Sequence, residues 1–347
     1  MAKEPVTIVS LGRDAGPGAE LLAQLERAGE VMVLGRASEA QAAIRMCRDR
    51  KPRCALLFVD STVQLELLRA VLGAVNLPVV ALSRTTTLGV EAMAAGASET
   101  LPASAAAGQV GTAVRLMAEL QTVTRRRSPL PFSQPPLPPP TRPRAELDRR
   151  PLVLVTASTG GPPALVQLVG ALGPDFAAPV LIVQHMPDDY DATFAAWLGA
   201  QLPLPVEVAQ PGTTPQPGRV YLVRSGFNTV LGHGGFFLTR PRSPTGPCPS
   251  ADVLFESVAA LPDFEVCALV MTGMGTDGAR GLLAIRKAGG YTLVQDKASC
   301  VIFGMPAEAL RLGAAEFSLS PLSLAEQLRA WLKPLREHHP KRGPLAP

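Results

Sequence analysis

Aromatic residues make up only 5% of this 347-residue sequence, and no apolar run reaches the roughly 18 to 20 residues that a membrane-spanning helix requires. The chain also opens without the charged segment and apolar stretch of a signal peptide. Its five cysteines are an odd number, with no Cys-x-x-Cys pair and no histidine cluster, which argues against a disulfide framework and a zinc site. We therefore expect a cytoplasmic protein that does not insert into a membrane and holds no metal.

The net charge of +4 is unevenly distributed along the chain. Residues 125–150 carry +5 and residues 333–347 carry +3, so the remaining residues together carry −4. The basic residues lie in Pro-rich segments and are not interleaved with aromatic side chains in the way that nucleic-acid-binding surfaces often are. We expect no nucleic-acid partner.

A proline-rich segment at residues 125–150 divides the chain. Because proline lacks a backbone N–H and fixes φ, this segment cannot form a helix or a central strand, and we expect an extended linker. A proline-rich ligand for an aromatic-lined groove is the alternative. The sequence thus predicts a domain at 1–124, the linker, a second domain at 151–332 and a basic, disordered tail at 333–347.

In both domains short apolar strands alternate with helical patterns, which predicts an α/β protein with two doubly wound parallel sheets. The first domain has strand-like runs at 7–11, 31–34, 55–59, 79–83 and 99–101, with helices at 19–27, 37–48, 64–75, 88–94 and 106–123. The second has strand-like runs at 152–155, 180–183, 266–272 and 291–295, with helices beginning near Pro163, Ala192, Asp252, Gly278 and Pro306. Residues 218–223 and 235–239 are expected to pair as a hairpin added to the second sheet.

Ser158 follows the first strand of the second domain, where the apolar run stops at Ser-Thr-Gly-Gly. In open α/β sheets the ligand crevice lies outside the carboxyl ends of the strands, and a helix that starts just after the serine would direct its N–H groups toward an oxyanion formed there. The alternative is an N-cap serine before a helix with proline in its first turn. This segment alone leaves both interpretations open.

A serine nucleophile needs a base and a group that orients the base. The second domain contains two histidines: His185 follows the strand at 180–183, whereas His233 lies between two glycines in an expected turn. His185 is therefore the better candidate. Asp277, at the glycine-rich end of the strand at 266–272, is the candidate acid, and the backbone N–H groups of Gly273, Met274 and Gly275 are candidate oxyanion donors.

The same glycine-rich loop, Gly273-Met-Gly-Thr-Asp-Gly278, also fits the dinucleotide-binding pattern G-x-G-x-x-G, with Asp296 at the end of a later strand. Asp277 would place a carboxylate where the two negative charges of a pyrophosphate must lie, and the unit comes late in the domain. We consider this interpretation the weaker one.

Five segments of the second domain resemble successive motifs of one enzyme family. They are Ala157-Ser-Thr-Gly-Gly161, Gln184-His-Met-Pro187, Pro249-Ser-Ala-Asp-Val-Leu-Phe255, Thr272-Gly-Met-Gly-Thr-Asp-Gly-Ala279 and Gln295-Asp-Lys-Ala-Ser-Cys-Val-Ile-Phe-Gly-Met-Pro306. The series resembles the chemotaxis protein-glutamate methylesterase family (CheB) over nearly all of residues 151–320. The resemblance implies hydrolysis of methyl esters on receptor glutamates with release of methanol, and often deamidation of receptor glutamines by the same acyl-enzyme route.

The resemblance implies roles for individual residues. Ser158 matches the family nucleophile, His185 its general base and Asp277 the acid that orients the histidine. Four further residues are expected to support the site and the oxyanion: Thr159, Gly160, Met274 and Gly275. No cofactor is implied. The implied partner is a methyl-accepting chemotaxis receptor, with a chemosensory kinase or coupling proteins as further candidates.

Three positions depart from the family pattern: Thr156 stands where glycine is usual, Asn228 where histidine is common, and Lys297 where glutamate is common. These departures put the shape of the receptor groove in doubt. A catalytically silent receptor-array adaptor with the same fold is the rival interpretation, against which the intact triad argues.

The first domain resembles the response-regulator receiver (flavodoxin-like) that precedes the esterase in this family, but without its phosphorylation residues. Phe58 lies near the usual phosphoacceptor aspartate, Ser10 and Leu11 near the acidic pair that holds Mg²⁺, and Pro102 near the lysine, while Ser83 matches. Two displaced carboxylates, Asp14 and Asp60, lie two or three residues from the expected places, and a shift of that size moves a side chain out of reach. We expect a pseudo-receiver without a phosphorylation site.

Overall fold

The computed structural model describes residues 4–12, 17–126, 149–239 and 246–338, and its chain forms two compact units, 1–128 and 129–347. Most of the expected linker, Asp14 and residues 339–347 lie outside the described residues. Within the described ranges, no helix is both long and apolar enough to cross a lipid bilayer.

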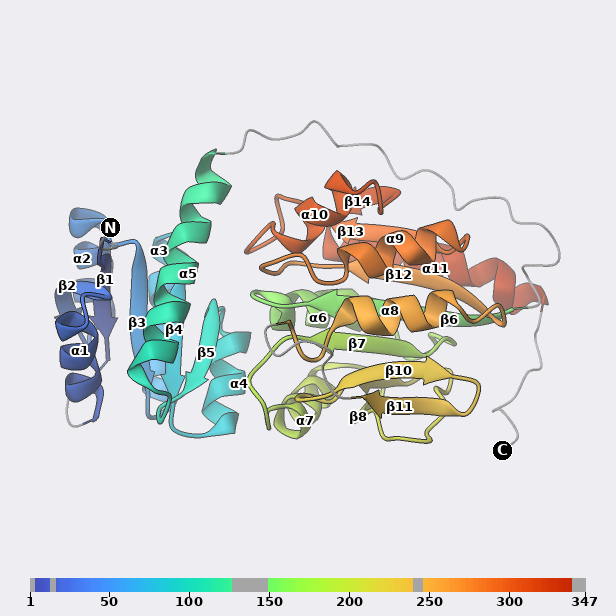
Figure 1. Ribbon diagram of the computed structural model, residues 1–347, viewed down its shortest axis with the longest axis horizontal. Coiled ribbons are helices and arrows are strands. Elements are labelled where there is room, and N and C mark those ends of the chain that lie inside the picture. Colours follow the sequence, from blue (N-terminus) through green and yellow to red (C-terminus); the bar gives the residue numbers. More distant parts are fainter. Residues whose placement is uncertain (1–3, 13–16, 127–148, 240–245, 339–347) are drawn as a thin grey trace. The chain divides into compact units, whose positions relative to one another are not determined.

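The N-terminal unit is a five-stranded parallel sheet with strand order β2-β1-β3-β4-β5 (Figure 1). Its strands are β1 (Val6–Leu11), β2 (Val31–Ala37), β3 (Cys54–Val59), β4 (Val79–Ser83) and β5 (Glu99–Pro102). Its helices are α1 (Pro17–Arg27), α2 (Ala40–Arg50), α3 (Thr62–Ala74), α4 (Thr86–Ala94) and α5 (Ala107–Arg126). α1 packs on α5 and α2 packs on α3, which in turn packs on α4, so the sheet is covered on both faces. This order is that of flavodoxin-like folds, as the sequence predicted.

The C-terminal unit contains a seven-stranded parallel sheet with strand order β14-β13-β12-β6-β7-β9-β8. Its strands are β6 (Arg150–Ala157), β7 (Val180–Gln184), β8 (Val206–Val208), β9 (Val220–Leu222), β12 (Phe264–Val270), β13 (Tyr291–Gln295) and β14 (Phe317–Leu319). The central strands are almost wholly apolar and buried, as parallel strands covered on both faces must be. The predicted fold class, two doubly wound parallel-sheet domains, is confirmed.

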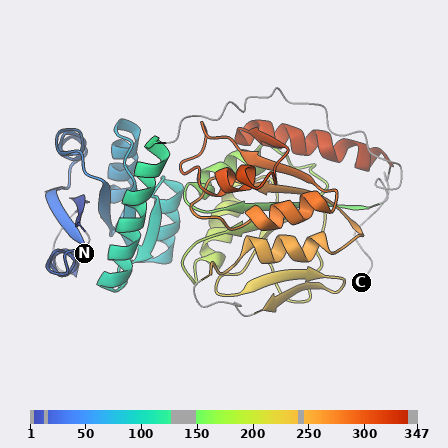
Figure 2. The same cartoon turned by 45° about the horizontal axis from the view of Figure 1, so that its top comes forward.

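Helices flank this sheet on both faces (Figures 1 and 2). They are α6 (Gly161–Gly170), α7 (Asp191–Gln201), α8 (Ala251–Ala259), α9 (Ala279–Lys287), α10 (Met305–Arg311) and α11 (Pro321–His338). α8 packs on α9 and α9 on α10, whereas α6 packs on α7 and α11. α11 continues past position 332 to His338, so the structure assigns residues 333–338 to the last helix and not to the expected tail.

The expected hairpin is only half correct. β9 joins the parallel sheet between β7 and β8, and the separate antiparallel hairpin is formed by β10 (Asn228–Gly232) and β11 (Gly235–Thr239). β10 packs against α8, beside the sheet (Figure 2). The sequence of the three-residue strand β9 does not show which strands it pairs with. Its partners are β7 and β8, and β8 was not predicted.

Candidate active site

The carboxyl ends of β6, β7 and β12 lie side by side at the centre of the sheet, where the strand order reverses. Ala157 on β6 pairs with Gln184 on β7, and Ser158 and His185 directly follow these two paired residues. The N–H of His185 donates to the Ala157 carbonyl at 3.0 Å, and the N–H of Ser158 donates to the Thr272 carbonyl at 3.0 Å. Ser158 and His185 therefore lie at the same edge of the sheet, and both are half-buried.

Ser158 is not an N-cap. The N-cap of α6 is Gly160, which has a φ of 78° in the left-handed region that favours glycine. Ser158 thus lies on the turn between β6 and α6, with its own carbonyl accepting from the N–H of Gly161 at 2.8 Å. Gly273 permits the approach of the neighbouring loop, since a Cβ there would lie 2.8 Å from the Cβ of Ser158.

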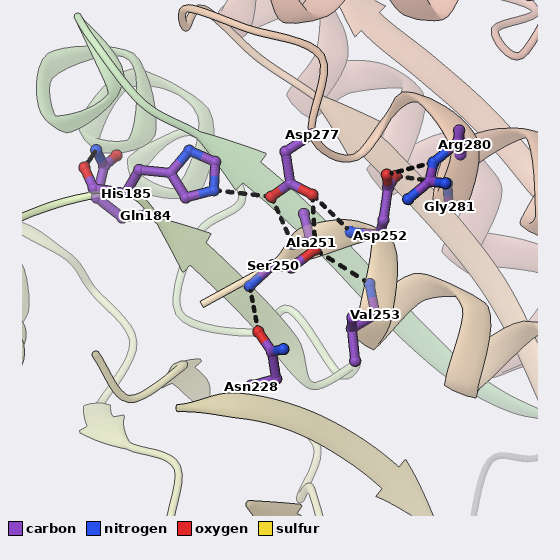
Figure 3. Close-up of polar contacts among 10 residues, drawn as sticks. All are labelled: Gln184, His185, Asn228, Ser250, Ala251, Asp252, Val253, Asp277, Arg280 and Gly281. Carbon is purple, nitrogen blue, oxygen red and sulfur yellow. Dashed lines mark hydrogen bonds and ion pairs between the residues drawn. The ribbon is translucent and has the colours of Figure 1, made fainter. Parts of the chain in front are cut away.

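His185 and Asp277 form a hydrogen bond at the same edge (Figure 3), with 2.8 Å between His185 Nε2 and Asp277 Oδ2. The side chain of Asp277 is 6% exposed and that of His185 is 19% exposed. A carboxylate can only accept, so the proton of the neutral imidazole lies on Nε2 and Nδ1 is left as the basic nitrogen. Among the described residues, no hydrogen bond joins the Ser158 hydroxyl to the His185 ring.

Asp277 is held at the N-terminus of α8, far from it in sequence. Its Oδ2 accepts from the N–H of Ala251 at 2.7 Å, and its Oδ1 accepts from the N–H of Asp252 at 3.1 Å and from the hydroxyl of Ser250 at 2.8 Å. Burial by itself would raise the pKa of Asp277, but the hydrogen bond and charge of His185 and the two N–H groups of α8 outweigh it and lower this pKa. Asp277 therefore stays ionised at neutral pH.

The candidate oxyanion donors fall into two groups. The N–H of Gly273 donates to the Ile302 carbonyl at 3.0 Å, so the expectation that it faces the oxyanion is wrong. Four other N–H groups at this edge have no hydrogen-bond acceptor within the described part of the chain, those of Thr159, Gly160, Met274 and Gly275. Such donors can stabilise an oxyanion that forms beside Ser158.

The dinucleotide interpretation conflicts with the start of α9, which follows the glycine-rich loop. There the N–H of Gly281 already donates to Asp252 Oδ1 at 2.8 Å, and Arg280 pairs with Asp252 Oδ2 at 3.0 Å. Asp277, inside the loop, faces His185 and α8. Two carboxylates thus occupy the place that a pyrophosphate would need.

Three side chains that the sequence analysis did not assign to the site support it. Gln184 donates through Nε2 to the carbonyls of Ser158 at 3.0 Å and His185 at 2.9 Å, which ties the two strand ends together. Thr272 Oγ1 donates to the Thr159 carbonyl at 2.9 Å, and Ser250 binds Asp277. All three lie within the recognised motifs, but only the tertiary contacts reveal what they bind.

The three departures from the family pattern have defined places in the structure, and the rejected histidine lies elsewhere. Asn228 Oδ1 accepts from the N–H of Ser250 at 2.8 Å, so this residue supports the start of α8. Thr156 packs against Gly278, where a Cβ would lie 2.7 Å from the Thr156 methyl group. Lys297 is half-buried at the end of β13. His233 lies in the β10–β11 turn and pairs with Asp263, which precedes β12 at the opposite edge of the sheet.

No cluster of metal-ligating side chains was found at this edge. Across residues 4–12, 17–126, 149–239 and 246–338, no group of three or more histidine, cysteine, aspartate or glutamate side chains could hold a metal ion.

Comparison with known proteins identifies the family. The family model of the CheB methylesterase matches residues 153–328. Protein-glutamate methylesterase/protein-glutamine glutaminase 3 of Myxococcus xanthus is 34% identical, with 93% of this chain and 94% of the relative covered. The protein of that name from the group 3 operon of Rhodopseudomonas palustris is 31% identical, with 95% and 97% covered.

A solved structure is also similar. The CheB methylesterase catalytic domain of Thermotoga maritima is 32% identical, with a TM-score of 0.48, and the match covers 51% of this chain and 96% of that domain. Because the curated relatives align along almost the whole chain and the family model spans the unit that carries Ser158, His185 and Asp277, this chain belongs to the CheB methylesterase family.

Proposed function

We propose that this chain is a serine hydrolase that removes methyl groups from methylated glutamates on the cytoplasmic helices of chemotaxis receptors. The observation that carries the proposal is the hydrogen bond between His185 and Asp277 at the strand edge next to Ser158, in a chain of this family. The names of the relatives support both the ester substrate and a second reaction, deamidation of receptor glutamines.

The proposed reaction starts with the Ser158 hydroxyl. Because Asp277 fixes the proton of His185 on Nε2, Nδ1 is free to take the Ser158 proton, once the hydroxyl turns toward it. Ser158 Oγ then attacks the ester carbonyl carbon, and a tetrahedral intermediate forms. In this arrangement the two ring nitrogens exchange the roles they have in serine proteases of the chymotrypsin type.

The oxyanion is stabilised by backbone N–H groups from the two loops, Thr159 with Gly160 or Met274 with Gly275. Protonated His185 donates to the leaving methoxide, and methanol departs to leave an ester between Ser158 and the glutamate side chain. Water activated by His185 hydrolyses this ester and frees the glutamate carboxylate. With a glutamine substrate the leaving group is ammonia and the acyl-enzyme is the same.

The test is methanol release from a methylated receptor. Ser158→Ala removes the nucleophile, so we expect methanol release to fall by a factor of about 10³ or more. The control is Ser257→Ala, which removes a half-buried hydroxyl on α8 that donates to the Leu254 carbonyl and accepts from the N–H of Leu231, and it should keep near wild-type release. Near wild-type turnover in Ser158→Ala would refute the nucleophile assignment. If the wild-type chain released no methanol, the silent-adaptor interpretation would replace the enzyme.

We also propose that the N-terminal unit is a receiver that is not phosphorylated. Phe58 is buried at the end of β3, and its ring lies against the first turn of α1, where a Cβ on Gly18 would be 3.0 Å from Phe58 Cε1. The side chain of Asp60 is about half-exposed, and its Oδ1 lies 3.9 Å from Nε of Arg84. An aromatic ring thus fills the space beside the expected phosphoacceptor position.

Acetyl phosphate with Mg²⁺ tests this part of the proposal. We expect no acid-labile acyl phosphate on the full chain and no change in methanol release on addition of the phosphodonor. A stoichiometric acyl phosphate would show that Asp60 or Asp14 accepts the phosphoryl group and would overturn the pseudo-receiver assignment.

A further inference from the structure

The hydroxyl of Ser250 binds the carboxylate of the candidate triad acid. Ser250 Oγ donates to Asp277 Oδ1 at 2.8 Å, and the direction is fixed because an ionised carboxylate has no proton to give (Figure 3). Among the described residues, Ser250 and His185 are the two side chains that hydrogen-bond to Asp277. They bind different oxygens, so each oxygen of the carboxylate is held by one side chain.

Ser250 is itself rigidly placed. It is 9% exposed, its N–H donates to Asn228 Oδ1 at 2.8 Å, and its Oγ accepts from the N–H of Val253 as the N-cap of α8. Asn228 is also buried and belongs to β10, which packs on α8. A change of χ1 that moved Oγ away from Asp277 would therefore also lose the cap.

An acidic residue near the start of each of the helices α8 and α9 accepts hydrogen bonds from N–H groups at the start of the other helix. Asp277, just before α9, binds N–H groups at the start of α8, and Asp252, in the first turn of α8, binds the N–H of Gly281 at the start of α9. A Cβ on Gly281 would lie 2.6 Å from the Cβ of Phe255, so the two helices pack closely. These reciprocal hydrogen bonds fix the spacing between Ser250 and Asp277.

These contacts affect both the geometry and the charge of the site. The Asp277 carboxylate accepts hydrogen bonds from His185 and Ala251 on Oδ2 and from Ser250 and Asp252 on Oδ1. These four bonds stabilise its ionised form. Each donor takes part of its negative charge. Without the Ser250 donor, the carboxylate would attract the protons of its three remaining donors more strongly, including that on His185 Nε2.

We propose that Ser250 is a positioning residue for the proposed esterase: its hydroxyl fixes the orientation of Asp277 and limits how strongly Asp277 stabilises protonated His185. The inference rests on the proposed function. A carboxylate that is fixed by both Ser250 and His185 keeps Nδ1 of His185 directed toward Ser158.

Other charged groups near the pair come from three elements. Asp252 on α8 and Arg280 on α9 pair with each other at 3.0 Å, and Asp188 follows His185 after β7 in an exposed loop position. A change at Ser250 alters none of these charges. A shift in the pH dependence of the Ser250→Ala variant would therefore report on the lost hydrogen bond.

The experiment measures methanol release by the full chain between pH 5 and 9, in wild type, Ser250→Ala and Ser250→Thr. In Ser250→Ala we expect the acid limb of kcat/KM to move up by about 0.5 to 1 pH unit and kcat to fall roughly 3- to 10-fold at neutral pH, with KM unchanged. Threonine retains the hydroxyl and should restore both. The control is Ser61→Ala, at the N-cap residue of α3 in the other unit, whose hydroxyl donates to Gln64 Oε1 at 2.9 Å.

A merely structural role would lower Tm in Ser250→Ala, as in Ser61→Ala, and leave the pH profile in place; that result would overturn the proposal. NMR titration of the His185 ring, assigned by comparison with His185→Gln, gives an answer that does not depend on turnover. The ring should titrate at higher pH in Ser250→Ala than in wild type and Ser250→Thr. If the titration shifts but no protein releases methanol, the proposed function fails and the positioning role stands; an unshifted titration overturns the positioning role.

Discussion

Asp277→Asn tests the candidate triad by exchanging a single heavy atom, one carboxylate oxygen for the nitrogen of an amide. The carboxylate accepts four hydrogen bonds, two on each oxygen. An asparagine can keep its oxygen toward Ser250 and the N–H of Asp252, which places its NH₂ group against the N–H of Ala251 and against His185 Nε2. Two donors then face each other at a position where the native distance is 2.7 Å.

The magnitudes follow from these contacts. A hydrogen bond to a buried charged group contributes about 1.5 to 3 kcal/mol, and the change removes the one from Ala251 and weakens the others, while it also relieves the desolvation of a charge. We expect a net loss of roughly 2 to 4 kcal/mol in the free energy of unfolding. His185 can satisfy the amide only by accepting at Nε2, which moves its proton to Nδ1 and leaves no base for Ser158. The cost in kcat should be about 10⁴-fold, as for the same change in serine proteases.

Methanol release under single-turnover conditions, together with ¹⁵N NMR of the His185 ring, measures both consequences. The spectrum should move from the Nε2–H to the Nδ1–H form. Glu265→Gln is the matched control, because it neutralises a buried carboxylate at the other end of β12, where the glutamate pairs with Arg149. It should leave methanol release within about twofold. A folded Asp277→Asn variant that keeps more than a tenth of wild-type turnover would refute the assignment of Asp277.

Two further predictions concern stability. Gly160→Ala places a Cβ on a residue at φ 78°, 2.5 Å from the Val301 side chain, and should lower the free energy of unfolding by about 2 to 3 kcal/mol and displace Ser158. Gly173→Ala is the control, because this glycine has a φ of 84° but nothing within 4 Å, and it should lower the free energy of unfolding by only about 1 kcal/mol. Chemical denaturation measures both. Because the pKa of Asp277 is lower in the folded protein, its carboxylate contributes stability that is complete above the unfolded value near 4 and is lost as the pH falls through the folded value. The difference in unfolding free energy between wild type and Asp277→Asn should therefore shrink below about pH 4, and a difference that stays constant down to pH 2 would contradict this origin.

The alternation of apolar strands and helices was enough to predict both sheets, because parallel strands buried on both faces must be apolar and their helices amphipathic. It missed three short strands of the second unit, β8, β10 and β14, and also the 18-residue helix α11, which contains Pro334. β8 and β14 have three residues each, and their pairing energy comes from neighbours that are distant in sequence. The wrong partner for β11 has the same origin: a turn pattern shows that a strand reverses, but not which sheet the preceding strand joins.

The sequence predicted where the site residues lie on the sheet, but not which groups they bind. Ser158, His185 and Asp277 each follow a strand, so the sequence alone determined that they would meet at one edge of the sheet, as parallel strands require. Only the tertiary structure decided that Ser158 is not an N-cap, that Gly273 is not a free donor, and that Asp277 faces the N-terminus of α8. The physical reason is that strand and helix signals are local, whereas the hydrogen-bond partners of a buried carboxylate are chosen by how two helices pack together.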